Sequence, residues 1–385
     1  MIKTENQELI RKLMPLEETY WSLEKTYGIP SDSASRVENI SIESSINNLM
    51  YPGRKPVSLR NVYQPQKVLN GKEAENSRFI FSLGTQLNQG GTATIHRAFD
   101  RLLGKAGIAK VIHQDSSAEF RHKVNEQVQL EAEIMSILTN DPYLKSHIVE
   151  VWDVSNVRIN GKDSIVIFEE YMDTEKYFTL NRTENYRRLA GPQRLSLIEQ
   201  LCKIVDKLAE YQIFHHDLSA ANIFVDLETL QVKIGDFGTS NFAFNVGKYG
   251  VEVNAAWTSP ERELYDGKTE DPGLASEVFS LTTLAYFIIT GGDRPFVVRK
   301  LPSERYPYLS TSKKFETGFH PDSGNDLRDL AKNIFNKEQI ERLIIVFEKG
   351  LALDPAERYQ CGEELMNAIN EAILPPDEII GFVRE

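Results

Sequence analysis

Hydrophobic and polar residues alternate over a series of short runs in the first half of the chain. Runs rich in β-branched and aromatic residues, separated by turn residues, predict strands at 78–87, 92–99, 107–113, 149–157 and 164–171. Residues 117–139 instead repeat apolar side chains at helical spacing. This part of the chain is therefore expected to form an antiparallel sheet with one helix.

Beyond Pro192 the spacing of apolar residues becomes mainly helical. It predicts helices at 193–213, 274–290, 338–352 and 361–373, with short strands at 223–225 and 232–234. A strand-rich lobe that precedes a helix-rich lobe is typical of an α+β fold with two lobes.

The first 77 residues differ from both lobes and read as an N-terminal extension. Apolar positions in 1–30 have helical spacing interrupted at Pro15, and the residues that follow are rich in Ser, Asn, Pro and Gly. A packing extension and a regulatory or docking segment are both open interpretations. We expect one domain over 78–373, with lobes at about 78–170 and 174–373, and a tail at 374–385.

Composition narrows the functional classes. The 385 residues carry a net charge of −12, which argues against coating nucleic acid. Cys202 and Cys361 form no metal or redox spacing, which favours a reducing, cytoplasmic location. The N-terminus has no apolar signal-peptide core, although export without a cleavable signal stays open. The apolar run at Leu281–Ile289 is too short for a membrane span and predicts a buried helix.

Two motifs carry the chemistry. The segment 215–222 reads His-His-Asp-Leu-Ser-Ala-Ala-Asn, and Asp236-Phe237-Gly238 begins nineteen positions after Asp217. Phosphoryl transfer requires neutralisation of the nucleotide charge and an acceptor hydroxyl held in line with the γ-phosphate. One carboxylate facing the hydroxyl, with a second carboxylate and an amide on a metal ion, meets these needs. Asp217, Asp236 and Asn222 have the right types and order.

Together these motifs resemble those of the eukaryotic-type protein kinase family, and the resemblance extends over about 78–373. It implies a two-lobed protein kinase-like fold, ATP with Mg²⁺ (Mn²⁺ being the alternative metal), and a protein substrate. It further implies that Asp217 accepts the substrate proton, while Asn222 and Asp236 bind the metal.

The same resemblance extends upstream to the nucleotide site. Residues 87–95 look like a worn glycine-rich loop that keeps its middle glycine, and Lys110 stands where the family has its phosphate-binding lysine. A simple hairpin turn and a solvent-facing lysine are the structural alternatives. The resemblance places the following residues at the nucleotide: Asn88, Gly90, Ala93, Ile95, Ile108 and Lys110. Ile108 stands where kinases usually have a small Ala, which predicts a tighter adenine pocket.

Further roles implied by the resemblance concern the helix and the hinge. Glu133 is the expected helix-borne partner of Lys110, with Glu131 and Glu126 as alternatives. Phe168 is the expected gatekeeper, with a core aromatic as the structural alternative. Backbone groups of residues 169–172, including Glu170 and Met172, are expected to bond adenine.

Other positions match the family's supporting structure. Glu261 and Arg358 are expected to form a buried ion pair, and Glu277 to anchor the backbone of the catalytic loop. Phe237, His215 and Ile137 are expected to stack in a hydrophobic spine.

Some positions depart from the pattern. His216 replaces an arginine that grips an activation-loop phosphate, which indicates activity without that phosphorylation. Ser219 and Asn254 replace the residues typical of Ser/Thr kinases, yet the arginine of tyrosine kinases is missing too. We favour Ser/Thr over Tyr as the acceptor.

Two other readings remain open. A small-molecule kinase of the aminoglycoside or choline kinase type would share the metal motifs, and a pseudokinase scaffold would share the fold. The basic, Pro- and Tyr-rich segment 294–314 is a solvated loop by default, or else a docking surface for an acidic partner. Oligomeric state is not indicated.

Overall fold

The computed structural model describes residues 68–69, 73–75, 79–89, 93–100, 102, 104–112, 128, 130–159, 162–182, 187–242, 256–263, 273–295 and 327–374. All of them belong to one compact unit that begins at Gln66. The expectations for residues 1–67, Gly90, Glu126, Asn254, the bulk of the basic segment and the end of the tail lie outside these residues.

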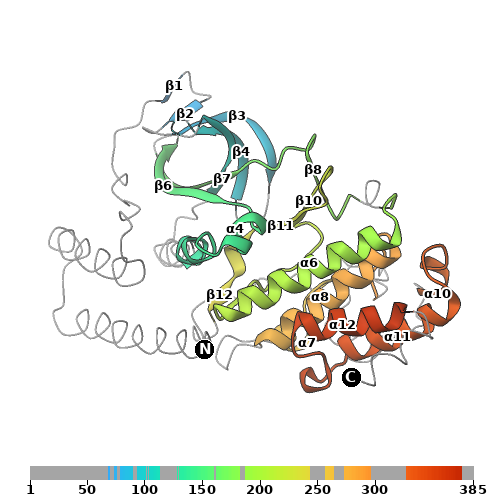
Figure 1. Ribbon diagram of the computed structural model, residues 1–385. Coiled ribbons are helices and arrows are strands. Elements are labelled where there is room, and N and C mark those ends of the chain that lie inside the picture. Colours follow the sequence, from blue (N-terminus) through green and yellow to red (C-terminus); the bar gives the residue numbers. More distant parts are fainter. Residues whose placement is uncertain are drawn as a thin grey trace, which may run out of the picture. The chain divides into compact units, whose positions relative to one another are not determined.

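The first lobe is built on a seven-stranded antiparallel sheet (Figure 1). Its strand order is β1-β2-β3-β4-β5-β7-β6. The strands are β1 (Val68–Leu69), β2 (Glu73–Glu75), β3 (Phe79–Gln89), β4 (Ala93–Asp100), β5 (Lys105–Ile112), β6 (Val151–Ile159) and β7 (Lys162–Glu170). The five predicted strands are confirmed as β3 to β7. Because β1 and β2 join the same sheet, the sheet begins before the predicted boundary at 77.

The two faces of this sheet bury different side chains. On one face Phe79, Phe81, Ala109 and Phe168 pack into a cluster. The other face packs Ile165 and Ile167 against Val128 of the helical segment that includes 130–138. Successive residues of a strand point to opposite faces, so the register of β5 against β7 decides which residues meet on each face.

The second lobe is mainly helical. Its long helices α6 (Gly191–Glu210), α8 (Gly273–Thr290), α11 (Lys337–Gly350) and α12 (Gly362–Ile373) confirm the four predicted ones. Shorter helices are α4 (Pro142–His147), α7 (Pro260–Glu263) and α10 (Leu327–Leu330). Helices α6, α11 and α12 each bury one apolar stripe, and α8 is a long apolar segment buried all round, so these four were predictable. The six-residue helix α4 is too short to show either pattern.

Helix α8 is long and apolar enough to cross a membrane by length and composition, and is the one such helix found among the described residues. Every residue from Ser276 to Thr290 is nevertheless buried within the protein. The helix therefore forms the centre of the helical lobe, as the sequence predicted.

Three short strands lie where the two lobes meet in Figure 1: β8 (Tyr177–Thr179), β10 (Ile223–Asp226) and β11 (Val232–Ile234). A second pair joins β9 (Ile213–Phe214) to β12 (Asn241–Phe242). Strands β10 and β11 were predicted, whereas β8, which is as short as β11, and the two-residue strand β9 were not. Together they frame the loop at 215–222 and the turn at 235–236.

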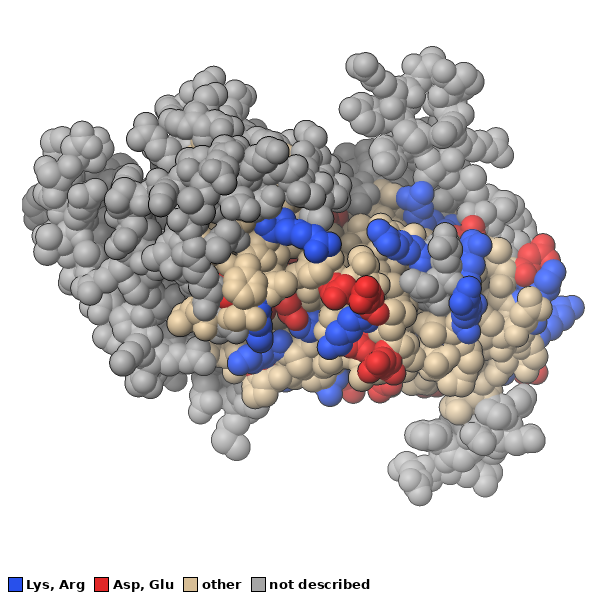
Figure 2. Space-filling model, turned by 90° about the horizontal axis from the view of Figure 1, so that it is seen from above, with Lys and Arg blue, Asp and Glu red and all other residues tan. Residues whose placement is uncertain are grey.

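Charged side chains are mixed on the face shown in Figure 2. Lys and Arg alternate there with Asp and Glu over the described surface. On this face the net charge of −12 is therefore not gathered into one acidic field.

Candidate active site

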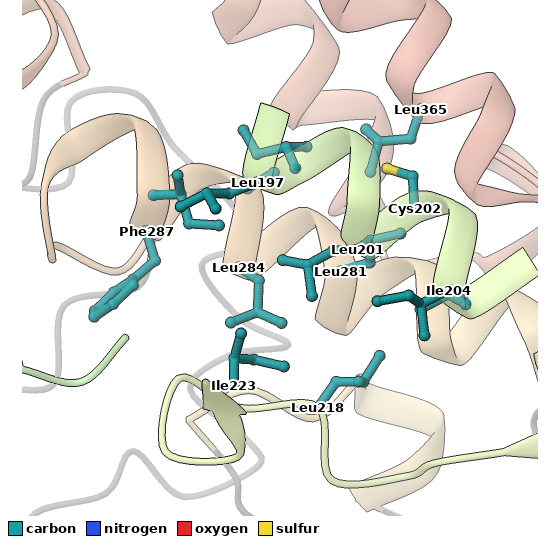
Figure 3. Close-up of a cluster of buried hydrophobic side chains, with 14 of the residues drawn as sticks. Leu197, Leu201, Cys202, Ile204, Leu218, Ile223, Leu281, Leu284, Phe287 and Leu365 are labelled. Atoms are coloured by element: carbon teal, nitrogen blue, oxygen red, sulfur yellow. The ribbon is translucent and has the colours of Figure 1, made fainter. Parts of the chain in front are cut away.

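The loop at 215–222 is anchored from below by the helical core. Leu218 and Ile223 point toward Leu281 and Leu284 of α8 in Figure 3. From the same helix, the buried Glu277 carboxylate accepts hydrogen bonds from the backbone N–H groups of His215 (3.1 Å) and His216 (2.8 Å). This confirms the anchoring role predicted for Glu277. It also explains how His216 holds a positive φ of 64°, because two fixed amides over-determine the turn.

Asp217 and Asn222 lie side by side within this loop. Asn222 Nδ2 donates to the Asp217 carboxylate at 2.8 Å and to the Asp217 backbone carbonyl at 2.9 Å. Both acceptors are oxygens without protons, so the amide nitrogen must face them. The carbonyl oxygen of the Asn222 side chain therefore faces elsewhere and keeps its lone pairs for a cation.

Asp236 is brought to this pair by the next turn. The Gly235 N–H donates to the Asn222 carbonyl at 2.9 Å. His215 Nε2 donates to the Gly235 carbonyl at 3.1 Å, and its Nδ1 accepts from the Asp217 N–H at 3.3 Å. The His215 and Phe237 rings lie 4.7 Å apart, and Ile137 packs against the same core cluster. The predicted contact of Phe237 with His215 is confirmed. Together with the hydrogen bonds of His215 and Gly235, this contact holds Asp217, Asn222 and Asp236 in one site.

Lys110 reaches the site from β5. Its Nζ lies 2.8 Å from Glu169 and 3.4 Å from Asp236. Burial lowers the pKa of the ammonium, but the negative charges of Glu169 and Asp236 raise it by more, so the net shift of the pKa is upward. The Lys110 charge in turn lowers the pKa of Asp236 despite the opposing effect of burial. Asp236 is thus an ionised carboxylate beside a cation.

The prediction that Glu133 pairs with Lys110 is wrong. Glu133 is exposed on the helical segment, whereas Glu131 is buried near Lys110. A Cβ on Gly238 would lie 3.7 Å from Glu131 Oε2, which places that carboxylate beside the Asp236-Phe237-Gly238 turn. Residues two apart on a helix point in very different directions, so only one of them can face the site.

The gatekeeper prediction for Phe168 is also wrong. Phe168 is fully buried in the opposite face of the sheet, with its ring stacked on Phe79 at 3.9 Å. Its register partner is Ala109, whereas Lys110 pairs with Ile167. Because side chains alternate along β7, it is Glu169 that stands on the face of Lys110.

Three further residues predicted at the nucleotide, Ala93, Ile95 and Ile108, share that face. The register pairs Ile95 with Lys110 and Ile108 with Glu169, so these positions form adjoining rows across the sheet, and the backbone of Asn88 pairs with that of Ile95. Ala93 is two residues from Ile95 and lies on the same side. Their roles in binding stay predictions.

The hinge segment leads away from this face. The Glu170 side chain binds Lys233 of β11 at 2.6 Å, and its N–H donates to the Glu150 carbonyl at 2.9 Å. Its side chain is therefore committed to the scaffold. Met172 lies just beyond the end of β7, outside any helix or strand.

The predicted Glu261–Arg358 ion pair is confirmed. Arg358 Nη1 and Nη2 lie 2.6 and 2.8 Å from the two carboxylate oxygens. The guanidinium also donates to the carbonyls of Ala275, Ala352 and Leu353. A planar fork of this kind fixes geometry as well as charge.

The described sheet packs against one helical segment and is followed by a helical lobe, whose loop at 215–222 carries paired Asp and Asn side chains. These features define the two-lobed kinase class. A model of the protein kinase domain matches residues 81–349. The chain belongs to the protein kinase family.

Relatives are similar only at low identity. Cell division control protein 2 homolog D of Antirrhinum majus is 27% identical over 177 residues, which is 45% of this chain and 54% of that protein. Cyclin-dependent kinase B2-1 of Arabidopsis thaliana is 28% identical over 177 residues, with the same two shares. Serine/threonine-protein kinase Nek11 of Mus musculus is 24% identical over 306 residues, or 75% of this chain and 46% of that protein. The chain thus spans about half the length of these curated relatives.

Proposed function

We propose that the protein transfers the γ-phosphate of ATP to a hydroxyl group of a protein substrate, with Ser or Thr favoured over Tyr. The observation that carries this proposal is the geometry of Asp217. One carboxylate oxygen is held by Asn222, while Oδ1 is buried and accepts no hydrogen bond from the described residues. An oriented carboxylate with one such oxygen suits the acceptance of a hydroxyl proton.

The surroundings of Asp217 support a role as general base. Burial raises the pKa of its carboxyl group, and the negative charges of Asp236 and Glu277 act in the same direction. His215 and the hydrogen bond from Asn222 oppose the rise. A carboxylate with a raised pKa binds a proton more readily during transfer than an exposed aspartate does.

A divalent cation fits the oxygens of Asn222 and Asp236. The Asn222 amide nitrogen is committed to Asp217, which leaves its carbonyl oxygen for a cation, and Asp236 is ionised. The described residues contain no cluster of three or more His, Cys, Asp or Glu side chains suited to a metal. Mg²⁺ is commonly held by one or two carboxylates together with substrate phosphates, and it supplies neutralisation of their charge.

Lys110 supplies a fixed positive charge on the same side of the sheet. Its ammonium has three N–H donors, of which Glu169 and Asp236 engage two. The third can donate to a phosphate oxygen. A preorganised charge of this kind stabilises the transition state without reorganisation.

The choice of a protein hydroxyl rests on two supports. The Glu261–Arg358 pair matches the family's arrangement below the activation loop, which small-molecule kinases lack. Several relatives carry serine/threonine-protein kinase in their names. Ser219 in place of the usual lysine is the position that most separates this chain from typical Ser/Thr kinases.

Mass spectrometry of the protein and of a mixed Ser/Thr/Tyr protein substrate after incubation with Mg·ATP tests the proposal. We expect phosphate on Ser or Thr with wild-type protein. We expect loss of transfer by Asp217→Ala and Asp236→Ala with unchanged melting curves, and a fall of orders of magnitude in Lys110→Ala. ATP binding without transfer would favour a pseudokinase. Phosphorylation of a sugar or amine with no labelled protein would favour a small-molecule kinase.

A further inference from the structure

We propose that Glu169, on strand β7, is the residue that positions the Lys110 ammonium in the nucleotide site. In protein kinases this lysine normally pairs with a glutamate of the helix. Here the sheet itself supplies the carboxylate. The inference deepens the proposed function, because Lys110 is the residue through which Glu169 acts.

The distances identify the partner. Within the described part of the chain, the ion pairs of Lys110 go to Glu169 at 2.8 Å and to Asp236 at 3.4 Å. Glu131 of the helical segment makes no ion pair with Lys110 among the described residues. The shorter of the two ion pairs is thus made within the sheet.

The register explains why the contact forms. Strands β5 and β7 are hydrogen-bonded neighbours, with Lys110 opposite Ile167 and Ile108 opposite Glu169. Glu169 is therefore the diagonal neighbour of Lys110 on the same face, a separation that two long side chains span easily. Backbone pairing of the two strands fixes this relation, whatever the position of the helix.

Burial gives the pair its specificity. The Lys110 and Glu169 side chains are only 15% and 5% exposed. Removing one member would leave an unpaired charge in a poorly solvated place, which is strongly unfavourable. Glu131 is buried as well, but no ion pair joins it to Lys110 among the described residues, so the near counter-charge is that of Glu169.

The first measurement reads the state of Lys110 without any turnover. Limited acetylation at pH 7, followed by peptide mass spectrometry, gives the ratio of labelling at Lys110 to that at the exposed Lys332. We expect Glu169→Gln to raise this ratio by about tenfold, since the amine loses the 2.8 Å ion pair that holds it. Glu131→Gln should change the ratio by less than about twofold, because Glu131 makes no ion pair with Lys110 among the described residues.

The second measurement is the steady-state kinetics of the same variants. Glu169→Gln should lower kcat by about 10- to 100-fold with a smaller change in KM for ATP, as a misplaced catalytic group does. The loss of kcat in Glu131→Gln should be at least tenfold smaller than the loss in Glu169→Gln. In a Lys110→Ala background, Glu169→Gln should cost nothing further, because Glu169 acts through the lysine.

Glu348→Gln, on the exposed face of α11, removes a charge far from the site and should match wild type. If Glu169→Gln does not fold, Glu169→Asp keeps the charge and should show a partial loss. Equal or larger effects of Glu131→Gln in both measurements, or a full loss from Glu169→Gln on top of Lys110→Ala, would overturn the proposal. If wild-type protein transfers no phosphate, the proposed function fails while the labelling ratio still decides the role of Glu169.

Discussion

At the scale of single residues, burial and charge together set the protonation of Glu131. Its carboxyl group is buried beside Glu169 and Asp236, and burial raises its pKa to about 8. Lys110 lowers the pKa but does not offset the loss of water. An acid in this position is a neutral group at pH 7, in contrast to Asp236, which Lys110 keeps ionised.

This difference predicts a pH dependence of stability. Between about pH 4.5, the ordinary value, and about pH 8, the folded state binds a proton at Glu131 that the unfolded state has lost. The free energy of unfolding therefore falls as pH rises through this window, by at most about 1.4 kcal/mol per pH unit.

Urea denaturation of wild type and Glu131→Gln from pH 5 to pH 9 measures this contribution. The variant has no proton to lose at this position. The free energy of unfolding of the variant should therefore increase relative to that of wild type as pH rises. Parallel curves over the whole range would show that Glu131 titrates near its ordinary pKa.

At the scale of elements, the sheet separates a structural face from a chemical face. Phe168 and Phe79 stack within the first, while Lys110 and Glu169 meet on the second. Neighbouring residues 168 and 169 thus have unrelated roles, because each step along a strand reverses the face.

Phe168→Ala should therefore act on stability. Removing a fully buried aromatic ring leaves a cavity, and we expect a loss of about 3–5 kcal/mol in the free energy of unfolding. Phe99→Ala is a matched control on β4, where the ring is 45% exposed, and should cost about 0.5 kcal/mol or less. Unchanged stability together with acceptance of ATP analogues enlarged on the base would instead restore Phe168 as the gatekeeper.

At the scale of the whole described unit, charged residues join segments that are distant in sequence. Glu277 of α8 holds the catalytic loop, Lys233 of β11 holds the Glu170 side chain of β7, and Arg358 holds Glu261. Each ties a site segment to a rigid element, which is how loops acquire a fixed geometry.

The Arg358 contact gives a test at this scale. The guanidinium is fully buried, so Glu261→Ala leaves a cation without its counter-charge and should cost about 3–5 kcal/mol of stability. Adding Arg358→Met should recover part of that loss. The Arg328–Glu341 pair has the same chemistry but is exposed, and Glu341→Ala should have a far smaller effect. Similar costs for Glu261→Ala and Glu341→Ala in urea denaturation would contradict this account.

The sequence alone determined the elements and the types of residue in the site. Periods of two and 3.6 residues predicted β3 to β7 and helices α6, α11 and α12, because burial of one face imposes those periods, and a long apolar run predicted α8. The motifs that contain Asp217, Asn222 and Asp236 indicated one site through their resemblance to the protein kinase family.

Tertiary structure decided which member of each close pair faces the site. Glu131 rather than Glu133 does so from the helical segment, and Glu169 rather than Phe168 does so from β7. The physical reason is the same in both cases: a shift of one or two residues turns a side chain to another face. That choice depends on the register against β5 and on helix packing, which are contacts between segments that no local pattern records.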